Sequence, residues 1–160
     1  MGKSIIFLYS YHSMNTSKIG NVIAKKINAK VIYLKNNAEI VELDEYDLIG
    51  FGSGIASGKH YVQILKYAEE LKNIQNKKVF MFSTCGTYNQ RRLVNNHKAL
   101  RNILQSKGFE IIGEFSCKGF SYYNFKLFKT KKRFEMNKGR PNEEDIKNAE
   151  IFAEKLLEKI

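Results

Sequence analysis

Short apolar runs alternate along the chain with longer segments in which apolar residues recur every three or four positions. The short runs are apolar at consecutive positions, which is typical of parallel strands buried on both faces of a sheet. They predict five strands, over Ser4–Tyr9, Val31–Leu34, Leu48–Phe51, Val79–Phe82 and Ile111–Phe115.

Helical periodicity fills most of the intervals between these strands. Pro141 and the acids at 143–145 are start signals for the last helix, and Gly108 is a stop signal for the one before it. Residues 30–52 differ, because two predicted strands are separated there only by a polar loop, so a helix should be short or absent. The periodic apolar positions predict helices around residues 19–27, 64–71, 93–104 and 146–160.

This alternation of strands and helices predicts a three-layer, doubly wound α/β sandwich around a five-stranded parallel sheet. Right-handed crossovers then bring every strand-to-helix loop to one rim, where open α/β sheets bind their ligands. A chain of 160 residues is long enough for one core but short for two, so we expect a single domain over residues 1–160.

Charge is distributed unevenly. The net charge is +11, and residues 118–140 contribute +7 of it. Such a segment can steer an acidic partner, a nucleic acid or an anionic membrane surface, or it can be a solvated loop. Five aromatic residues interleave with its lysines, as in stacking platforms for nucleic acid; they are Tyr122, Tyr123, Phe125, Phe128 and Phe134.

The sequence favours a cytoplasmic protein with no membrane span. The apolar run near the amino terminus is too short for a span and lacks the features of a secretion signal. Two cysteines without such a signal do not indicate a disulfide framework. Cys85 and Cys117 should end adjacent strands, where they are either a redox pair or two inert buried thiols.

The first loop of the predicted rim, residues 10–16, is rich in hydroxyl and amide groups and leads directly into a helix. Free N–H groups and the positive end of the helix dipole attract anions there, and these side chains can add hydrogen bonds to phosphate oxygens. Alternatively, Asn15 or Thr16 only caps the helix.

Other site chemistries are disfavoured. Gly52 and Gly54 lack the third glycine of a dinucleotide fingerprint, and Gly58-Lys59 lacks the preceding glycine of a P-loop. Neither a nucleophile elbow nor metal-ligand spacing occurs in the sequence, so we expect neither catalytic side chains nor a metal site. The acidic cluster of a phosphoreceiver is replaced by residues 10–13.

In this context the chain resembles the flavodoxin family, whose first loop reads Thr/Ser-x-Thr-Gly-Asn-Thr and wraps the phosphate of flavin mononucleotide (FMN). Ser10, Asn15 and Thr16 match this pattern together with His12 or Ser13, whereas Met14 stands where the family usually has glycine. Residues 138–145 resemble a Gly-x-Pro-Asn-x-x-Asp segment that opens the last helix in a subgroup of the family. The resemblance implies the strand order 2-1-3-4-5.

The resemblance also implies FMN as cofactor. The second loop of the rim, residues 52–61, would let the flat flavin ring approach the backbone. The third loop, residues 83–89, would offer backbone N–H groups, with Tyr88 either stacking on the ring or covering the core. The implied cofactor-binding residues are Ser10, His12, Ser13, Met14, Asn15, Thr16, Ser53, Gly54, Ile55, Ala56, Ser83, Thr84, Cys85, Gly86, Tyr88 and Asn89.

Two functions follow as hypotheses. In the first, the protein transfers electrons through FMN as a carrier or small flavin reductase, and a carrier is favoured over a substrate-specific oxidoreductase. Its basic charge predicts a redox partner protein with an acidic face. Under this hypothesis a homodimer stays open, and nucleic acid is the less favoured partner. In the second, a flavodoxin-fold module without flavin uses residues 118–140 to engage nucleic acid or another anionic partner.

Overall fold

A computed structural model describes residues 2–11, 13–35, 38–127 and 130–160, with backbone only at 123 and 125–127. His12, one of the predicted cofactor ligands, therefore lies outside the described residues. In chain order the elements are β1 (Lys3–Tyr9), α1 (Asn15–Ile27), β2 (Ala29–Tyr33), β3 (Tyr46–Ala56), β4 (Lys59–His60), α2 (Val62–Glu70), β5 (Lys78–Cys85), α3 (Gln90–Ser106), β6 (Glu110–Lys118), β7 (Ser121–Leu127), β8 (Thr130–Met136) and α4 (Glu143–Leu157).

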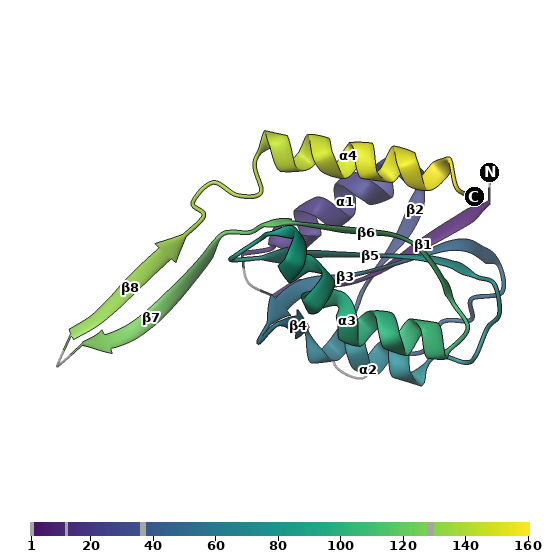
Figure 1. Ribbon diagram of the computed structural model, residues 1–160, viewed down its shortest axis with the longest axis horizontal. Helices are drawn as coiled ribbons and strands as arrows, with labels where there is room; N and C mark the ends of the chain where they lie inside the picture. Colours follow the sequence, from purple (N-terminus) through teal and green to yellow (C-terminus); the bar gives the residue numbers. More distant parts are fainter. Residues whose placement is uncertain (1, 12, 36–37, 128–129) are drawn as a thin grey trace.

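The five long strands form one parallel sheet in the order β2-β1-β3-β5-β6. Counted among these strands alone, this is the predicted order 2-1-3-4-5. Helices α1 and α4 cover one face of the sheet, and α2 and α3 cover the other (Figure 1). The predicted three-layer, doubly wound α/β sandwich is confirmed.

Two apolar cores fill the spaces between the layers. Along β1, Ile6 and Leu8 pack with the apolar stripes of α1 and α4, whereas Ile5 and Phe7 pack with those of α2 and α3. All four side chains are fully buried. Successive residues of a strand point to opposite faces, so a run that is apolar at every position feeds both cores.

Three strands of the structure, β4, β7 and β8, were not predicted from the sequence. β3 continues to Ala56 and turns back through Ser57 and Gly58, which both have positive φ, to pair with the short strand β4. Positive φ at both central residues is what a tight two-residue hairpin turn requires. The second rim loop of the prediction is therefore largely a hairpin. Between β2 and β3, the described residues form no helix.

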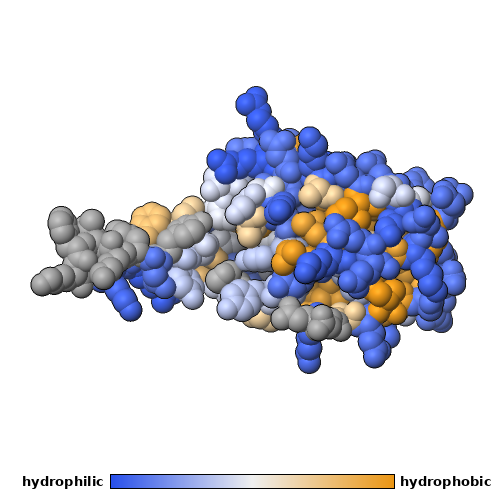
Figure 2. Space-filling view, turned by 90° about the horizontal axis from the view of Figure 1, so that it is seen from below, coloured by the Kyte–Doolittle hydropathy of each residue, from blue (hydrophilic) through white to orange (hydrophobic). Residues whose placement is uncertain are grey.

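The other two unpredicted strands, β7 and β8, pair antiparallel and form a hairpin that we call the arm (residues 121–136). The arm projects from the rim at the carboxyl ends of the parallel strands, while β1 begins and α4 ends at the opposite end of the molecule (Figure 1). Figure 2 shows the arm as a narrow extension of the body. Among the helices within the described ranges, none is long and apolar enough to cross a membrane.

The segment between the arm and α4 is fixed by a capping box. The Asn142 side chain accepts a hydrogen bond from the Asp145 N–H, and the Asp145 carboxylate accepts one from the Asn142 N–H. Arg140 also donates to this buried carboxylate, at 2.7 Å. These bonds satisfy N–H groups at the helix start and hold the chain as it returns from the arm.

Candidate functional site

The carboxyl ends of β1, β3, β5 and β6 surround a small cavity of about 60 Å³. The start of α1 and the base of the arm complete its wall. This is the rim where the sequence predicted ligand binding. Its lining residues are Tyr11, Asn15, Thr16, Gly54, Ile55, Tyr61, Thr84, Cys85, Gly86, Gly119, Phe120 and Ser121.

The loop before α1 takes a left-handed conformation at two consecutive residues. Ser13 has φ 51° and Met14 has φ 52°. L-residues other than Asn and Asp rarely adopt this region, which favours glycine. Met14 therefore has the backbone that suits the glycine of the family pattern, and the loop keeps its course at a cost in backbone strain. Ser10 Oγ accepts a hydrogen bond from the Ser17 N–H at 3.2 Å.

The first turn of α1, where Asn15 and Thr16 line the cavity, carries buried polar atoms that have no hydrogen-bond partner. Asn15 Nδ2 donates to the Phe120 carbonyl at 2.7 Å, and Thr16 Oγ1 lies 2.8 Å from Thr84 Oγ1. Asn15 Oδ1 and Ser17 Oγ are both buried without a hydrogen-bond partner. Buried polar atoms are nearly always paired in folded proteins, so these two atoms mark a place for a polar ligand or water.

A second hollow, of about 380 Å³, adjoins the cavity at the start of α1. The two share Asn15 and Phe120. Positive side chains predominate in its wall, and together with the helix dipole they favour an anion. Its lining residues are Ser13, Asn15, Lys18, Phe120, Glu135, Lys138, Gly139 and Arg140.

Aromatic rings stand on the other side of the cavity. The ring of Tyr61 lies against the backbone of Gly54, where an added Cβ would come within 2.5 Å of a ring carbon. Tyr9 and Tyr61 meet edge to face, with their centroids 5.7 Å apart. Tyr11, 69% exposed, lies at the mouth. A flat ligand thus has aromatic surfaces and a close backbone beside it.

The loops after β5 and β6 are tied together at the base of the arm. Gly119 N–H donates to the Cys85 carbonyl at 2.9 Å. Asn137 Nδ2 donates to the carbonyls of Gly86 and Gly119, at 2.6 and 3.1 Å. A Cβ at Gly119 would come within 2.7 Å of Asn15 Nδ2, so glycine is required for this close approach. The arm and the cavity are therefore joined structurally.

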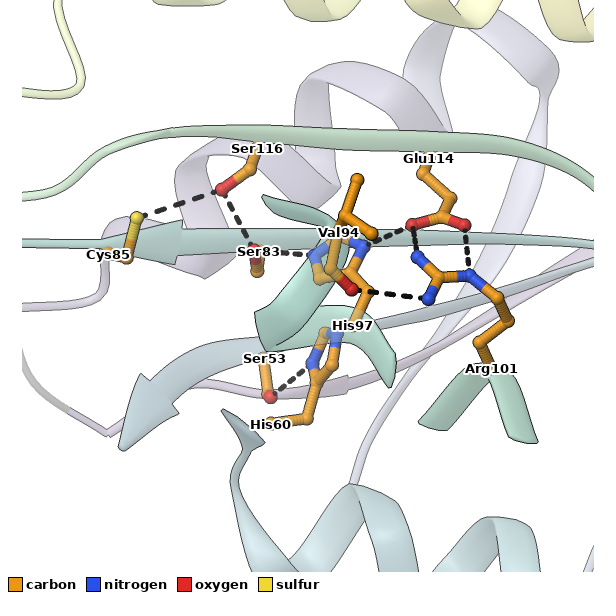
Figure 3. A network of polar contacts seen from close by, with 9 residues as sticks. All are labelled: Ser53, His60, Ser83, Cys85, Val94, His97, Arg101, Glu114 and Ser116. Atoms are coloured by element: carbon orange, nitrogen blue, oxygen red, sulfur yellow. Dashed lines mark hydrogen bonds and ion pairs between the residues drawn. The ribbon is translucent and has the colours of Figure 1, made fainter. Parts of the chain in front are cut away.

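Beneath the cavity lies a continuous buried polar network (Figure 3). His97 Nε2 lies 2.8 Å from Ser83 Oγ, and Ser83 Oγ lies 2.9 Å from Ser116 Oγ. On its other side, His97 Nδ1 lies 2.9 Å from a Glu114 oxygen. Arg101 Nε and Nη2 donate to the two oxygens of the same carboxylate, each at 2.7 Å.

A second histidine joins the network from β4. His60 Nδ1 lies 2.8 Å from Ser53 Oγ, and its ring centroid lies 4.7 Å from that of His97. His60 Nε2 is buried without a partner. Burial, with a smaller contribution from the charge of His97, lowers the pKa of His60 well below its usual value of 6.5. His60 is therefore neutral at pH 7.

Burial by itself would raise the pKa of Glu114. Hydrogen bonds from His97 and Arg101, with the charge of Arg101, outweigh it and lower the pKa to about 2. Burial also raises the pKa of the Cys85 thiol, which a hydrogen bond with Ser116 offsets in part. Both cysteines are free and buried, and the register pairs Cys117 with Thr84 rather than with Cys85.

Ser83, His97 and Glu114 are ordered like a nucleophile, a base and an orienting acid. Hydrolysis through this arrangement would need an accessible nucleophile. Ser83 is fully buried and is shared with Ser116, so a substrate cannot reach its hydroxyl. The network braces the strand ends below the cavity.

The structure brings seven of the predicted cofactor residues to the cavity wall, namely Asn15, Thr16, Gly54, Ile55, Thr84, Cys85 and Gly86. Ser53 and Ser83 are instead fully buried in the network, and Ser10 caps α1. Ala56 lies in the β3–β4 hairpin. Ser13 lines the adjoining anion hollow.

Tyr88 and Asn89 lie away from the cavity. Tyr88 lines a separate hollow of about 600 Å³ at the edge of β6, between α3 and α4. Asn89 is the N-cap of α3, where its side chain accepts a hydrogen bond from the Arg92 N–H. Neither residue therefore lines the cavity where the ring was expected.

The sequence contained signals for two residues of the network that were not predicted as site residues, His97 and Glu114. His97 occupies the apolar stripe of α3 between Leu93 and Leu100, which indicates an inward-facing histidine. Glu114 interrupts an apolar strand, and a buried carboxylate requires a partner. The prediction also missed three residues of the cavity wall, Tyr61, Gly119 and Phe120. The β3–β4 hairpin and the arm bring them to the cavity, and the sequence carries only weak local signals for these two features.

Comparison with known proteins identifies the family. The flavodoxin domain matches residues 6–154, so the chain belongs to the flavodoxin domain family. An uncharacterized protein of Methanocaldococcus jannaschii is 46% identical over 157 residues, which cover 97% of this chain and 98% of that protein.

Solved structures agree in fold. A flavodoxin from the domain Archaea has a TM-score of 0.66 at 17% identity, and the match covers 98% of this chain and 97% of that one. Oxidised flavodoxin 2 of Bacillus cereus has a TM-score of 0.69 at 19% identity, with coverage of 98% and 99%. Members of this family bind flavin, usually FMN, and typically transfer electrons to partner proteins.

Proposed function

We propose that this protein binds FMN at the rim cavity and the adjoining hollow, and that it acts as an electron carrier. The observation that carries the proposal is the pair of unpartnered buried atoms, Asn15 Oδ1 and Ser17 Oγ, at a helix start beside a basic hollow. Family membership supports the same reading. Bound FMN would supply the reversible electron exchange, and the protein would supply binding and electrostatics.

The residues present fit the two ends of the cofactor. Asn15, Thr16 and Ser17 with the N–H groups of the first turn would hold the phosphate, and Lys18 and Lys138 would balance its charge. Tyr11 and Tyr61 would flank the ring, and the backbone near Gly86 would face its polar edge. These basic groups favour added negative charge nearby, which makes reduction easier.

The cavity must widen to admit the ring, because drug-sized ligands occupy pockets of about 300 Å³ or more and the cavity holds about 60 Å³. Tyr11 is the exposed member of its wall. We expect this side chain to move when the cofactor enters, whereas Tyr61 is held against Gly54.

Ser13 offers a sharp test of the phosphate end. Asp and Asn both tolerate its left-handed backbone better than serine does, and they differ from each other only in charge. We expect Ser13→Asp to weaken FMN binding about tenfold relative to Ser13→Asn, because a carboxylate would face the phosphate. Riboflavin, which lacks the phosphate, should bind both variants equally. Binding is measured by quenching of flavin fluorescence.

A visible absorption spectrum of the protein purified from cells complements the titration. A flavin band, or saturable quenching by added FMN, supports the carrier. A colourless, folded protein that leaves FMN fluorescence unchanged would refute it and favour the second candidate, a flavin-free binding module. The feature that favours this second candidate is the basic arm.

A further inference from the structure

The arm presents basic and aromatic side chains together on an exposed surface. Lys131, Lys132 and Arg133 are exposed, as is 56% of Phe134. The Arg133 guanidinium lies 4.1 Å from the centroid of the Tyr122 ring, and its Nε lies 3.2 Å from Glu135. Arginine and aromatic residues are the side chains enriched at protein–protein interfaces.

The arm is long for a feature outside the core. Its register runs through seven consecutive pairs, from Ser121 opposite Met136 to Leu127 opposite Thr130. An isolated two-stranded hairpin is at best marginally stable in water. A partner that packs on the hairpin would therefore stabilise its ordered conformation.

The base of the arm is part of the cofactor cavity. Phe120 and Ser121 line the cavity, and Asn137 bonds to the backbone of the loops after β5 and β6. Phe120 N–H also donates to the Arg140 carbonyl at 3.1 Å, which closes the base. A partner bound along the arm would therefore sit beside the cavity mouth, which is where an electron must enter or leave.

Charge decides which partner fits. The arm carries five basic residues and one acid, a net charge of +4, so two copies of it would repel each other. An acidic protein surface complements this charge and has apolar area for Phe134. A nucleic acid would also match the charge and could stack its bases on the exposed rings, but it would not exchange electrons at the cavity. The position beside the cavity also favours a protein that exchanges electrons.

We propose that the arm is the docking surface for an acidic electron-transfer protein, which it holds next to the cofactor cavity. The electron-transfer role of this contact rests on the proposed function, but binding of the partner to the arm does not require flavin. Electrostatic steering would raise the association rate and make it fall with salt.

The test uses an acidic plant-type [2Fe–2S] ferredoxin as probe, with the full-length protein both loaded with FMN and free of it. One variant combines Lys131→Glu, Lys132→Glu and Arg133→Glu. The matched control combines Lys66→Glu, Lys98→Glu and Lys147→Glu, which are exposed on the helices of the body and change the net charge equally.

We expect the arm variant to weaken ferredoxin binding at low salt about tenfold or more, and the body variant by about threefold or less. Equal losses in the two variants, or absence of ferredoxin binding at low salt, would overturn the proposal. Tighter, arm-dependent binding of a single-stranded oligonucleotide or of phosphatidylglycerol vesicles would also overturn it and reassign the arm to that partner.

The outcomes separate this proposal from the proposed function. If the protein takes up no FMN but binds ferredoxin through the arm, the docking surface is supported and the proposal of an electron carrier is refuted. If the protein takes up FMN but its ferredoxin binding does not depend on the arm, the electron carrier is supported and the docking surface is refuted. Thermal unfolding of each variant checks that the body is intact.

Discussion

Two glutamate–arginine contacts, one in the body and one in the arm, show how surroundings set the role of the same chemistry. Glu114 and Arg101 meet through two hydrogen bonds in a site where their side chains are 19% and 21% exposed. Glu135 and Arg133 meet in the arm, where the exposed fractions are 39% and 52%. Partial burial makes the first contact structural, and exposure leaves the second available for a partner.

The largest effect should come from breaking the buried contact. Glu114→Ala would leave Arg101 and the fully buried His97 without their carboxylate. We expect it to lower the free energy of unfolding by about 3 kcal/mol, as loss of one partner from a buried pair usually does. Glu135→Ala, its matched control, should change the free energy by about 0.5 kcal/mol or less. Urea unfolding of both measures the contrast, and equal changes would contradict it.

His60 should make stability depend on pH. Its pKa is lowered in the folded state, so below about pH 6.5 the unfolded chain binds a proton that the folded chain does not. Stability is therefore lost as pH falls, at up to about 1.4 kcal/mol per pH unit. His60→Asn keeps a hydrogen-bonding group for Ser53. It should remove the contribution of one titrating group to the slope of stability against pH between pH 6.5 and 5. An unchanged slope would show that His60 is already protonated in the folded protein.

Glu114 contributes at lower pH with the same sign. Its pKa is lowered to about 2, so its stabilisation is complete above about pH 4.5 and is lost as pH falls toward 2. Glu114 adds no slope above about pH 4.5, so the His60 slope can be read separately between pH 6.5 and 4.5.

An intermediate effect is expected at Met14, on the rim between the two regions. Its φ of 52° disfavours any side chain with a Cβ. Met14→Ala and Met14→Gly both remove the side chain, but only glycine relieves the backbone. We expect the glycine variant to be more stable by about 1 kcal/mol. The opposite order in urea unfolding would mean that the loop does not hold this conformation.

The smallest effect on stability should follow removal of the arm. Ser121 and Met136 are paired, so an Asn-Gly turn can replace residues 122–135. We expect the free energy of unfolding to change by less than about 1 kcal/mol, because a lone hairpin contributes little stability. FMN affinity should stay within about threefold, since Phe120 and Asn137 remain. Loss of folding would place the arm among the structural elements of the body.

Much of the body could be predicted because buried positions require apolar residues, and these are visible in the sequence. Ile5 to Leu8 are apolar at every position, and only a strand covered on both faces requires that. The helical stripes and the signals near Pro141 predicted α4 closely. β4 was missed because it has two residues, and its only local sign was the Ser57-Gly58 turn.

The arm was harder to predict for a physical reason. Apolar and polar residues alternate from Tyr123 to Leu127, as a strand with two different faces would require, but residues 128–129 carry none of the usual turn residues. The network was hidden for another reason, because its members come from five separate elements, β3, β4, β5, α3 and β6. No local pattern indicates that the rings of His60 and His97 will lie side by side, tilted by 39°.

The position of the two chain ends has a practical consequence. β1 begins and α4 ends at the end of the molecule opposite the arm (Figure 1). A tag at either terminus should therefore immobilise the protein on an electrode with the cavity facing the solution. Voltammetry of such a film could then follow encounters with a dissolved partner, without the surface competing for the same face.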